Sequence, residues 1–144
     1  MVLTLFYLLL ALNQLIFDTL YWVLAFGYTE EGGGENPLDP PTDFFRVRMV
    51  ATLLEACGGY FDHGPPKRKL DDFLVYFQRY LLAKSALPMD VEFDVQDLFD
   101  LLRPKLVRLL TFDAAHAECL RLEECLRQEA AVRFNHPTGI PDAF

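Results

Sequence analysis

The chain has 144 residues, 52% of them hydrophobic, and a formal net charge of −8 from 13 Lys and Arg against 21 Asp and Glu. This length and composition fit one folded domain and exclude a largely disordered chain. The negative charge repels polyphosphate, so a general DNA-binding protein is disfavoured and any nucleic-acid contact needs a local basic patch. Three cysteines without a CxxC pair favour reduced thiols in a cytosolic or nuclear protein.

The first 26 residues are strongly apolar, and Asp18 is their one charged side chain. A signal peptide or a membrane anchor would share this composition, but no Lys or Arg precedes Arg46, and the longest run free of polar residues, 5–12, is too short to cross a bilayer. We therefore predict one or two helices that are buried on several sides, and keep a membrane anchor as the alternative. Such a helix exposes apolar surface wherever the neighbour that it packs against is absent.

An acidic stretch rich in Gly and Pro, 27–41, follows this segment. It predicts a long surface loop, because glycine raises the entropy of the backbone and proline lacks an amide donor. Thr42 is a suitable N-cap for the next helix, which we predict to run to Cys57 on the spacing of its apolar residues. Gly58 and Gly59 are expected to end it.

Apolar side chains at helical spacing predict a further helix over 70–84, after a turn at 62–66. These side chains occupy more than one side of the helix, so it needs several neighbours, as helices in stacked hairpins have. After a connector over 85–92, Asp94 can cap another helix whose inward side chains continue as far as Leu109.

Pro104 lies inside that helix, where it removes one backbone hydrogen bond, so we expect the helix to kink or to restart there, with a bend near Arg103. A last helix is predicted over 112–132, and the residues after Phe134 are predicted to form a loop. Alternation typical of a strand occurs only over 91–93, which is too short to form a sheet. The sequence therefore predicts an all-α fold of stacked helical hairpins.

The chain shows little sign of catalytic chemistry, since it has no nucleotide-binding loop and no GxSxG motif. Asp71 and Asp72 are adjacent on a helix and point about 100° apart, so they cannot act on one substrate atom. His116, Cys119 and Glu123 could share a helix face, but a metal site usually needs a fourth ligand and supporting contacts. We predict no enzymatic activity, no metal site, no cofactor and no small-molecule substrate.

A basic start followed by aromatic residues marks the predicted helix 70–84 as a candidate binding surface. Clustered cations can hold phosphates or an acidic partner, and tyrosines can stack on bases or anchor a protein interface. Spacings of three and four place the two tyrosines and the arginine on one ridge. A solvated helix start is the alternative, and a protein partner is favoured over RNA. The candidate residues are Lys67, Arg68, Lys69, Tyr76, Arg79 and Tyr80.

Three stretches carry a resemblance to a known family: LDPP at 38–41, FRVRMVATLLEACGGYFD at 45–62 and KRKLDDFLVYFQRY at 67–80. They resemble the last middle-of-initiation-factor-4G (MIF4G) domain of the second up-frameshift proteins, the scaffolds of nonsense-mediated mRNA decay. The similarity extends over about 13–129. It implies an α-solenoid of HEAT or MIF4G type, with a partial domain over 1–134 and a C-terminal tail over 135–144.

The resemblance also implies a non-enzymatic adaptor in the cytoplasm, with a perinuclear location as a variant of that expectation. In the family, the last MIF4G domain docks the RNA-recognition-motif fold of the third up-frameshift protein. The family's acidic docking residues match no residue of this chain, and we expect them to lie upstream of it. The family's basic run matches Lys67, Arg68 and Lys69, which makes them candidates for partner contact or for weak RNA contact. The alternative is a generic helical-repeat module that binds proteins in another translation-related factor. Membrane contact is not expected for the adaptor.

Overall fold

The computed structural model describes residues 1–26 and 36–135, and the predicted loop over 27–35 and tail over 136–144 lie outside this part of the chain. Within the described residues the structure contains helices and no strand, so the predicted all-α fold is confirmed. The elements are α1 (Val2–Ala25), α2 (Phe45–Cys57), the short 3₁₀ turn η2 (Gly58–Tyr60), α3 (Gly64–Ala83), α4 (Met89–Leu102) and α5 (Phe112–Asn135).

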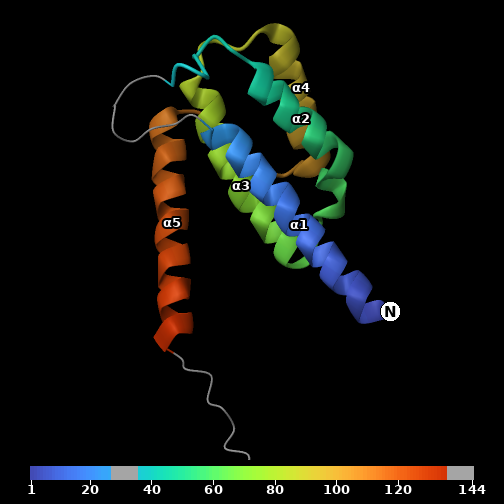
Figure 1. Ribbon diagram of the computed structural model, residues 1–144. Coiled ribbons are helices and arrows are strands. Elements are labelled where there is room, and N and C mark those ends of the chain that lie inside the picture. Colours follow the sequence, from blue (N-terminus) through green and yellow to red (C-terminus); the bar gives the residue numbers. More distant parts are fainter. Residues whose placement is uncertain (27–35, 136–144) are drawn as a thin grey trace, which may run out of the picture.

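The helices form two layers, one of α1, α3 and α5 and one of α2 and α4 (Figure 1). α2 and α3 are a hairpin: η2 joins them at one end, and at the other Ser85, just after α3, donates a backbone hydrogen bond to Pro41, just before α2. α2 and α4 run parallel, because Arg48 meets Asp90 near their starts. The consecutive helices α2, α3 and α4 thus alternate in direction, and the helices α2 and α4 within one layer are parallel. This arrangement confirms the predicted helical solenoid.

α1 and α3 also run parallel, and α5 packs antiparallel against α3. Phe17 on α1 lies against Phe61, with ring centroids 4.9 Å apart, and Tyr21, one turn later, meets Phe73 on α3 at 5.2 Å. On the other side of α3, the N-terminal cation Arg68 reaches Glu129 near the end of α5. α3 is thus the central helix of its layer.

The core lies between the two layers and is centred on α3. The predicted apolar face of this helix is buried, as the spacing required, and so is the polar side chain of Gln78. Gln78 is accommodated because its Nε2 donates to the carbonyl of Leu74 and its Oε1 accepts from the backbone N–H of Leu109 at 2.8 Å. The buried apolar residues of α3 are Leu70, Phe73, Leu74, Phe77 and Leu81.

Two predicted helix starts differ from the structure by several residues. α2 begins at Phe45 and not at Thr42: its N-cap residue is Phe44, which makes no side-chain cap hydrogen bond, and the carboxylate of Asp43 accepts the backbone N–H of Phe45 at 2.9 Å. α3 begins at Gly64, six residues before the predicted start. Its first turn contains two prolines, and proline is well tolerated there because these amides have no partner inside the helix.

The prediction for α4 was wrong at both ends. The helix begins at Met89, directly after Pro88, so residues 89–92 are helical and not part of a connector, and Asp94 lies inside the helix. Acidic side chains in its first turn favour the positive end of the helix dipole. The helix ends at Leu102, two residues before Pro104, which therefore stops the helix where a bend was expected.

α1 is a single helix, but the prediction that it is buried on several sides was wrong. Only Phe17, Leu20 and Val23 are buried, and its residues 2–12 are exposed. α1 is long and apolar enough by composition to cross a membrane, yet its second half packs into the core and could not do so without leaving it. The exposed large apolar side chains in its first half are Val2, Leu3, Leu5, Phe6, Tyr7, Leu8, Leu9, Leu10 and Leu12.

α5 runs from the predicted start at Phe112 to Asn135, three residues past the predicted end. Its contact with α3 is narrow: of its inward residues Ala115 and Cys119 are buried, whereas Leu126 is exposed. The small side chains at these two positions let the helix axes approach closely. α5 therefore lies along α3 for much of its length, while only these two of its side chains are buried.

Candidate binding surface

The basic start of α3 carries three cations that point in different directions. Lys67 is exposed, and Arg68 donates to a carboxylate oxygen of Glu129 on α5 at 2.5 Å. Lys69 turns the other way and donates to the amide oxygen of Gln14 on α1 at 2.7 Å, with its ammonium 6.0 Å from the ring centre of Phe17. These side chains remain accessible at the surface, but two of them also tie α3 to its neighbouring helices.

Acidic side chains interrupt the positive field of this helix start. Asp71 is paired with Arg103 at 2.5 Å, and the contact of Arg68 holds the pKa of Glu129 below its usual range. Partial burial raises the pKa of Asp72, although the nearby Arg68 opposes this shift. The start of α3 is therefore a mixed surface of alternating charge.

Tyr76 and Arg79 form a ridge between α3 and α5, as their spacing predicts. The guanidinium of Arg79 lies 5.3 Å from the ring centre of Tyr76, a cation–π geometry. Tyr76 donates to Glu123 at 3.4 Å, and Arg79 lies 3.4 Å from Nδ1 of His116. Burial raises the pKa of Tyr76 to about 12, with a smaller contribution from Glu123. Both side chains are half-buried by α5 and are only partly available to a partner.

Tyr80 belongs to a different cluster. Its hydroxyl donates to a carboxylate oxygen of Asp39 at 2.7 Å, and the ammonium of Lys84 lies 4.9 Å from its ring centre. Burial raises the pKa of Tyr80, and the hydrogen bond to Asp39 adds to this. The structure thus brings Tyr76 and Arg79 together and turns Tyr80 toward the segment that precedes α2.

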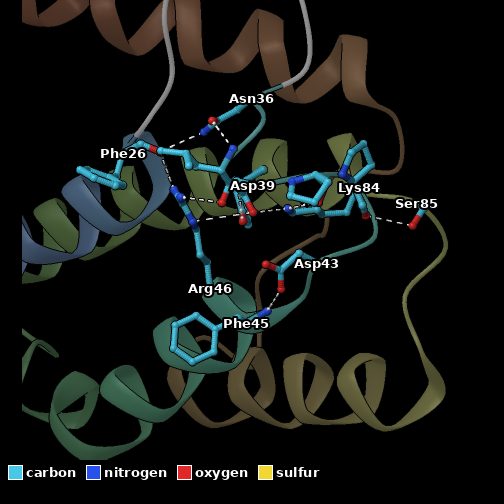
Figure 2. A network of polar contacts seen from close by, with 12 residues as sticks. Phe26, Asn36, Asp39, Asp43, Phe45, Arg46, Lys84 and Ser85 are labelled. Atoms are coloured by element: carbon cyan, nitrogen blue, oxygen red, sulfur yellow. Dashed lines mark hydrogen bonds and ion pairs between the residues drawn. The ribbon is translucent and has the colours of Figure 1, made fainter.

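The cluster around Asp39 joins α1, α2 and α3, as Figure 2 shows. Asp39 accepts a hydrogen bond from Lys84 at 2.6 Å and lies 3.7 Å from the guanidinium of Arg46, and the side chains of Asp39 and Lys84 are only 6% and 4% exposed. Arg46 also donates to the carbonyls of Val23 and Phe26 at the end of α1, at 2.9 and 2.8 Å.

Sequence reasoning did not find this cluster. Asp39 and Lys84 lie 45 residues apart, and no spacing rule connects them. The one available signal was that Asp39 lies within the LDPP stretch of the family resemblance. Asp39 is shared by the two cations Lys84 and Arg46, and Arg46 also donates to the carbonyls of Val23 and Phe26, so these contacts link the three helices.

The side chains His116, Cys119 and Glu123 do not converge. Arg79 lies against His116, Tyr76 binds Glu123, and Cys119 is buried with a pKa raised by desolvation. Across residues 1–26 and 36–135, no group of His, Cys, Asp and Glu side chains is arranged to hold a metal ion. A shallow hollow of about 480 Å³ between the start of α3 and the end of α5 is open to solvent and lined by Arg68, Cys125, Gln128, Glu129, Val132 and Arg133.

The described helices form a two-layer helical solenoid of stacked helix pairs. The MIF4G domain family matches residues 2–105, which are most of the described solenoid. The chain therefore belongs to the MIF4G family.

Curated relatives narrow the family to regulators of nonsense-mediated mRNA decay. The chain is 54% identical over 112 residues, 78% of its length, to the Regulator of nonsense transcripts UPF2 of Arabidopsis thaliana. It is 43% identical over 125 residues, 81% of its length, to the Regulator of nonsense transcripts 2 of Homo sapiens, and spans 9% of the length of each of these relatives. The predicted resemblance to the decay scaffolds is confirmed, and the assignment to their last MIF4G domain stays a prediction.

Proposed function

We propose that this chain is a non-enzymatic binding module of a cytoplasmic scaffold in nonsense-mediated mRNA decay. The observation that carries the proposal is its 54% identity, over 78% of its length, to a plant protein whose name states that it regulates nonsense transcripts. A helical solenoid suits this role because its stacked hairpins form extended surfaces and its charge pairs, such as those of Asp39, hold the helices in place.

The partner that we propose is the RNA-recognition-motif domain of the third up-frameshift protein. This proposal rests on the family resemblance, which places the acidic docking residues upstream of the chain. The chain itself would then support the docking helix and contribute contacts from its own surfaces. A version extended upstream should therefore bind the domain more tightly than the chain alone.

Isothermal titration calorimetry of both versions with that domain tests the proposal. Binding by both places a contact surface within residues 1–144, and binding by the extended version alone makes this chain the supporting part of the module. The control is an extended version whose added acidic residues are changed to the corresponding amides, which should lose binding. If neither version binds, the proposed partner is wrong and the generic helical-repeat module is favoured.

RNA is the second partner that we propose, with weak affinity. Lys67, Arg68 and Lys69 support it because their side chains are exposed at one helix start, where Arg68 also contacts Glu129 and Lys69 contacts Gln14. Changing all three to Glu should weaken the binding of a single-stranded RNA and reduce the salt dependence of its affinity. The matched control changes three exposed cations elsewhere, Lys105, Arg121 and Arg127, to Glu and should bind RNA more tightly than the patch variant. Equal RNA affinity for the patch variant and the unmodified chain would contradict the proposal.

A further inference from the structure

The outer face of the α2 and α4 layer carries a group of exposed apolar side chains. Phe45 and Met49 lie one turn apart on α2, and Met89 and Phe93 lie one turn apart on α4. Each is between 40% and 73% exposed. We call these four residues the α2–α4 platform. Large apolar side chains gathered on one exposed face are typical of interaction sites.

The two halves of the platform are neighbours because the two helices are aligned side by side (Figure 1). Arg48 on α2 contacts Asp90 at 2.6 Å and Asp94 at 3.9 Å on α4, so this ion pair lies between the two apolar pairs. In each helix the buried side chains lie on the opposite side, toward α1 and α3. Those buried side chains are Val47, Val50, Ala51 and Leu54 on α2 and Val91, Val95, Leu98, Phe99 and Leu102 on α4.

The surroundings of the platform hold more acids than bases, although the cation of Arg108 also lies against α4, 3.3 Å from Gln96 and 4.9 Å from the ring centre of Phe99. Between residues 85 and 102 the chain has five acids and no Lys or Arg. Asp97 and Asp100 are exposed one and two turns beyond Phe93, so they continue the outward side of α4. Arg48 is neutralised by its two aspartates, and the next cation along α2, Arg46, is turned away toward Asp39.

We propose that the α2–α4 platform binds a basic amphipathic helix of a protein partner. A third helix lying across α2 and α4 would contact the platform through apolar side chains at helical spacing, above the ion pair of Arg48. Lysine and arginine side chains on the flank of that helix would reach Asp97 and Asp100. The two methionines suit such a surface because their flexible thioethers adapt to the shape of the partner.

The charge of the platform argues for this occupant over others. A second copy of the chain would bring two acidic faces together, which opposes association. The exposed half of α1 is also apolar, but it has no charged side chain before Asp18, so it would not favour a basic helix over an acidic one. The inference does not depend on either partner proposed above, because the protein partner is assigned to acidic residues upstream of the chain and RNA to the basic start of α3, which lies in the other layer.

The probe is a fluorescein-labelled 18-residue peptide of leucine and lysine at amphipathic helical spacing, titrated with the whole chain and followed by fluorescence anisotropy. Changing Met89 and Phe93 together to Ala should weaken its binding about tenfold, because these side chains would form the centre of the contact. Changing Asp97 and Asp100 to Asn should weaken binding several-fold and reduce its salt dependence. All four positions are exposed, so far-UV circular dichroism should remain unchanged.

Two controls separate this site from general apolar adhesion. Phe134→Ala removes an exposed phenylalanine on α5, away from the platform, and should leave the affinity unchanged. A peptide with Glu in place of Lys should bind at least tenfold more weakly. The proposal is overturned if the lysine peptide does not bind, if both peptides bind equally, or if Leu5→Ser with Leu9→Ser on α1 abolishes binding while the platform variants do not.

Discussion

Asp39 compensates two cations at once, since it is bonded to Lys84 and lies beside Arg46 in the space that Figure 2 shows. Changing Asp39 to Asn would leave the ammonium of Lys84 buried without its counter-charge. Breaking a buried pair in this way costs about 3–5 kcal/mol. We expect the free energy of unfolding of Asp39→Asn to fall by about 3 kcal/mol, measured by urea denaturation.

The control for this prediction is Arg48→Gln, which removes an ion pair between exposed side chains. Water already solvates both partners of such a pair, so its loss should change the stability little. Equal stability losses for the two variants would show that the burial of Asp39 does not matter. Lys84→Met, which removes the other buried charge of the pair, should restore part of the stability of Asp39→Asn.

Gly58 lies where the end of α2 meets the end of α4. A Cβ at this position would lie 2.6 Å from Cδ2 of Leu102, too close without a shift of that side chain. We expect Gly58→Ala to lower the free energy of unfolding by about 1 kcal/mol. Alanine stabilises the fold by reducing the conformational entropy of the unfolded chain, but the steric overlap with Leu102 outweighs this gain. Gly59→Ala is the matched control, because nothing lies within 4 Å of its Cβ, and a thermal melt of both variants should separate them.

At the scale of the helices, the spacing of apolar residues predicted some elements well and others poorly. The buried face of α3 follows the period of the helix from Leu70 to Leu81, and this period is a local property of the chain. The start of α4 could not be predicted in the same way, because Asp94 is a good N-cap by type, whereas the helix begins after Pro88. The sequence signal for the true start was the pair Asp90 and Glu92, because acidic residues are favoured in the first turn of a helix by its dipole.

α5 depends on Ala115 and Cys119, the two side chains that it buries against the fold. Ala115→Leu would force α5 away from α3, because a larger side chain has no space in this narrow contact. We expect a loss of about 1–3 kcal/mol of stability and faster hydrogen exchange of the α5 amides. The control Ala114→Leu changes an exposed neighbour and should leave exchange unchanged; slow exchange in both variants would show that α5 does not need the close contact.

At the scale of the whole molecule, sequence reasoning predicted the class of fold but not the environment of α1. A helix that is apolar on every side has the same composition whether neighbours cover it or not, so its exposure depends on which other helices are present. The candidate ridge of Tyr76 and Arg79 followed from local spacing. The contact of Tyr80 with Asp39, 41 residues away, is a product of the tertiary fold and left no local pattern.

The exposed first half of α1 leads to a last prediction about stability. Its apolar side chains are exposed to solvent in the described structure. The chain spans only 9% of the length of its plant relative. We expect a chimera that carries the preceding region of that relative at the N-terminus to melt about 5 °C higher or more, because covering Leu5 and Leu9 removes apolar surface from water. Differential scanning calorimetry measures this shift.

A Gly- and Ser-rich extension of equal length is the control, since it adds chain without apolar side chains and should leave the melting temperature unchanged. Hydrogen exchange locates the effect: protection should increase over residues 2–15 of α1 and stay constant in α5, which packs on the opposite side of α3. An equal rise with both extensions, or a rise without new protection in α1, would contradict the idea that this helix is covered by preceding helices. The location of the added protection thus decides whether the apolar half of α1 is an internal contact of a longer solenoid.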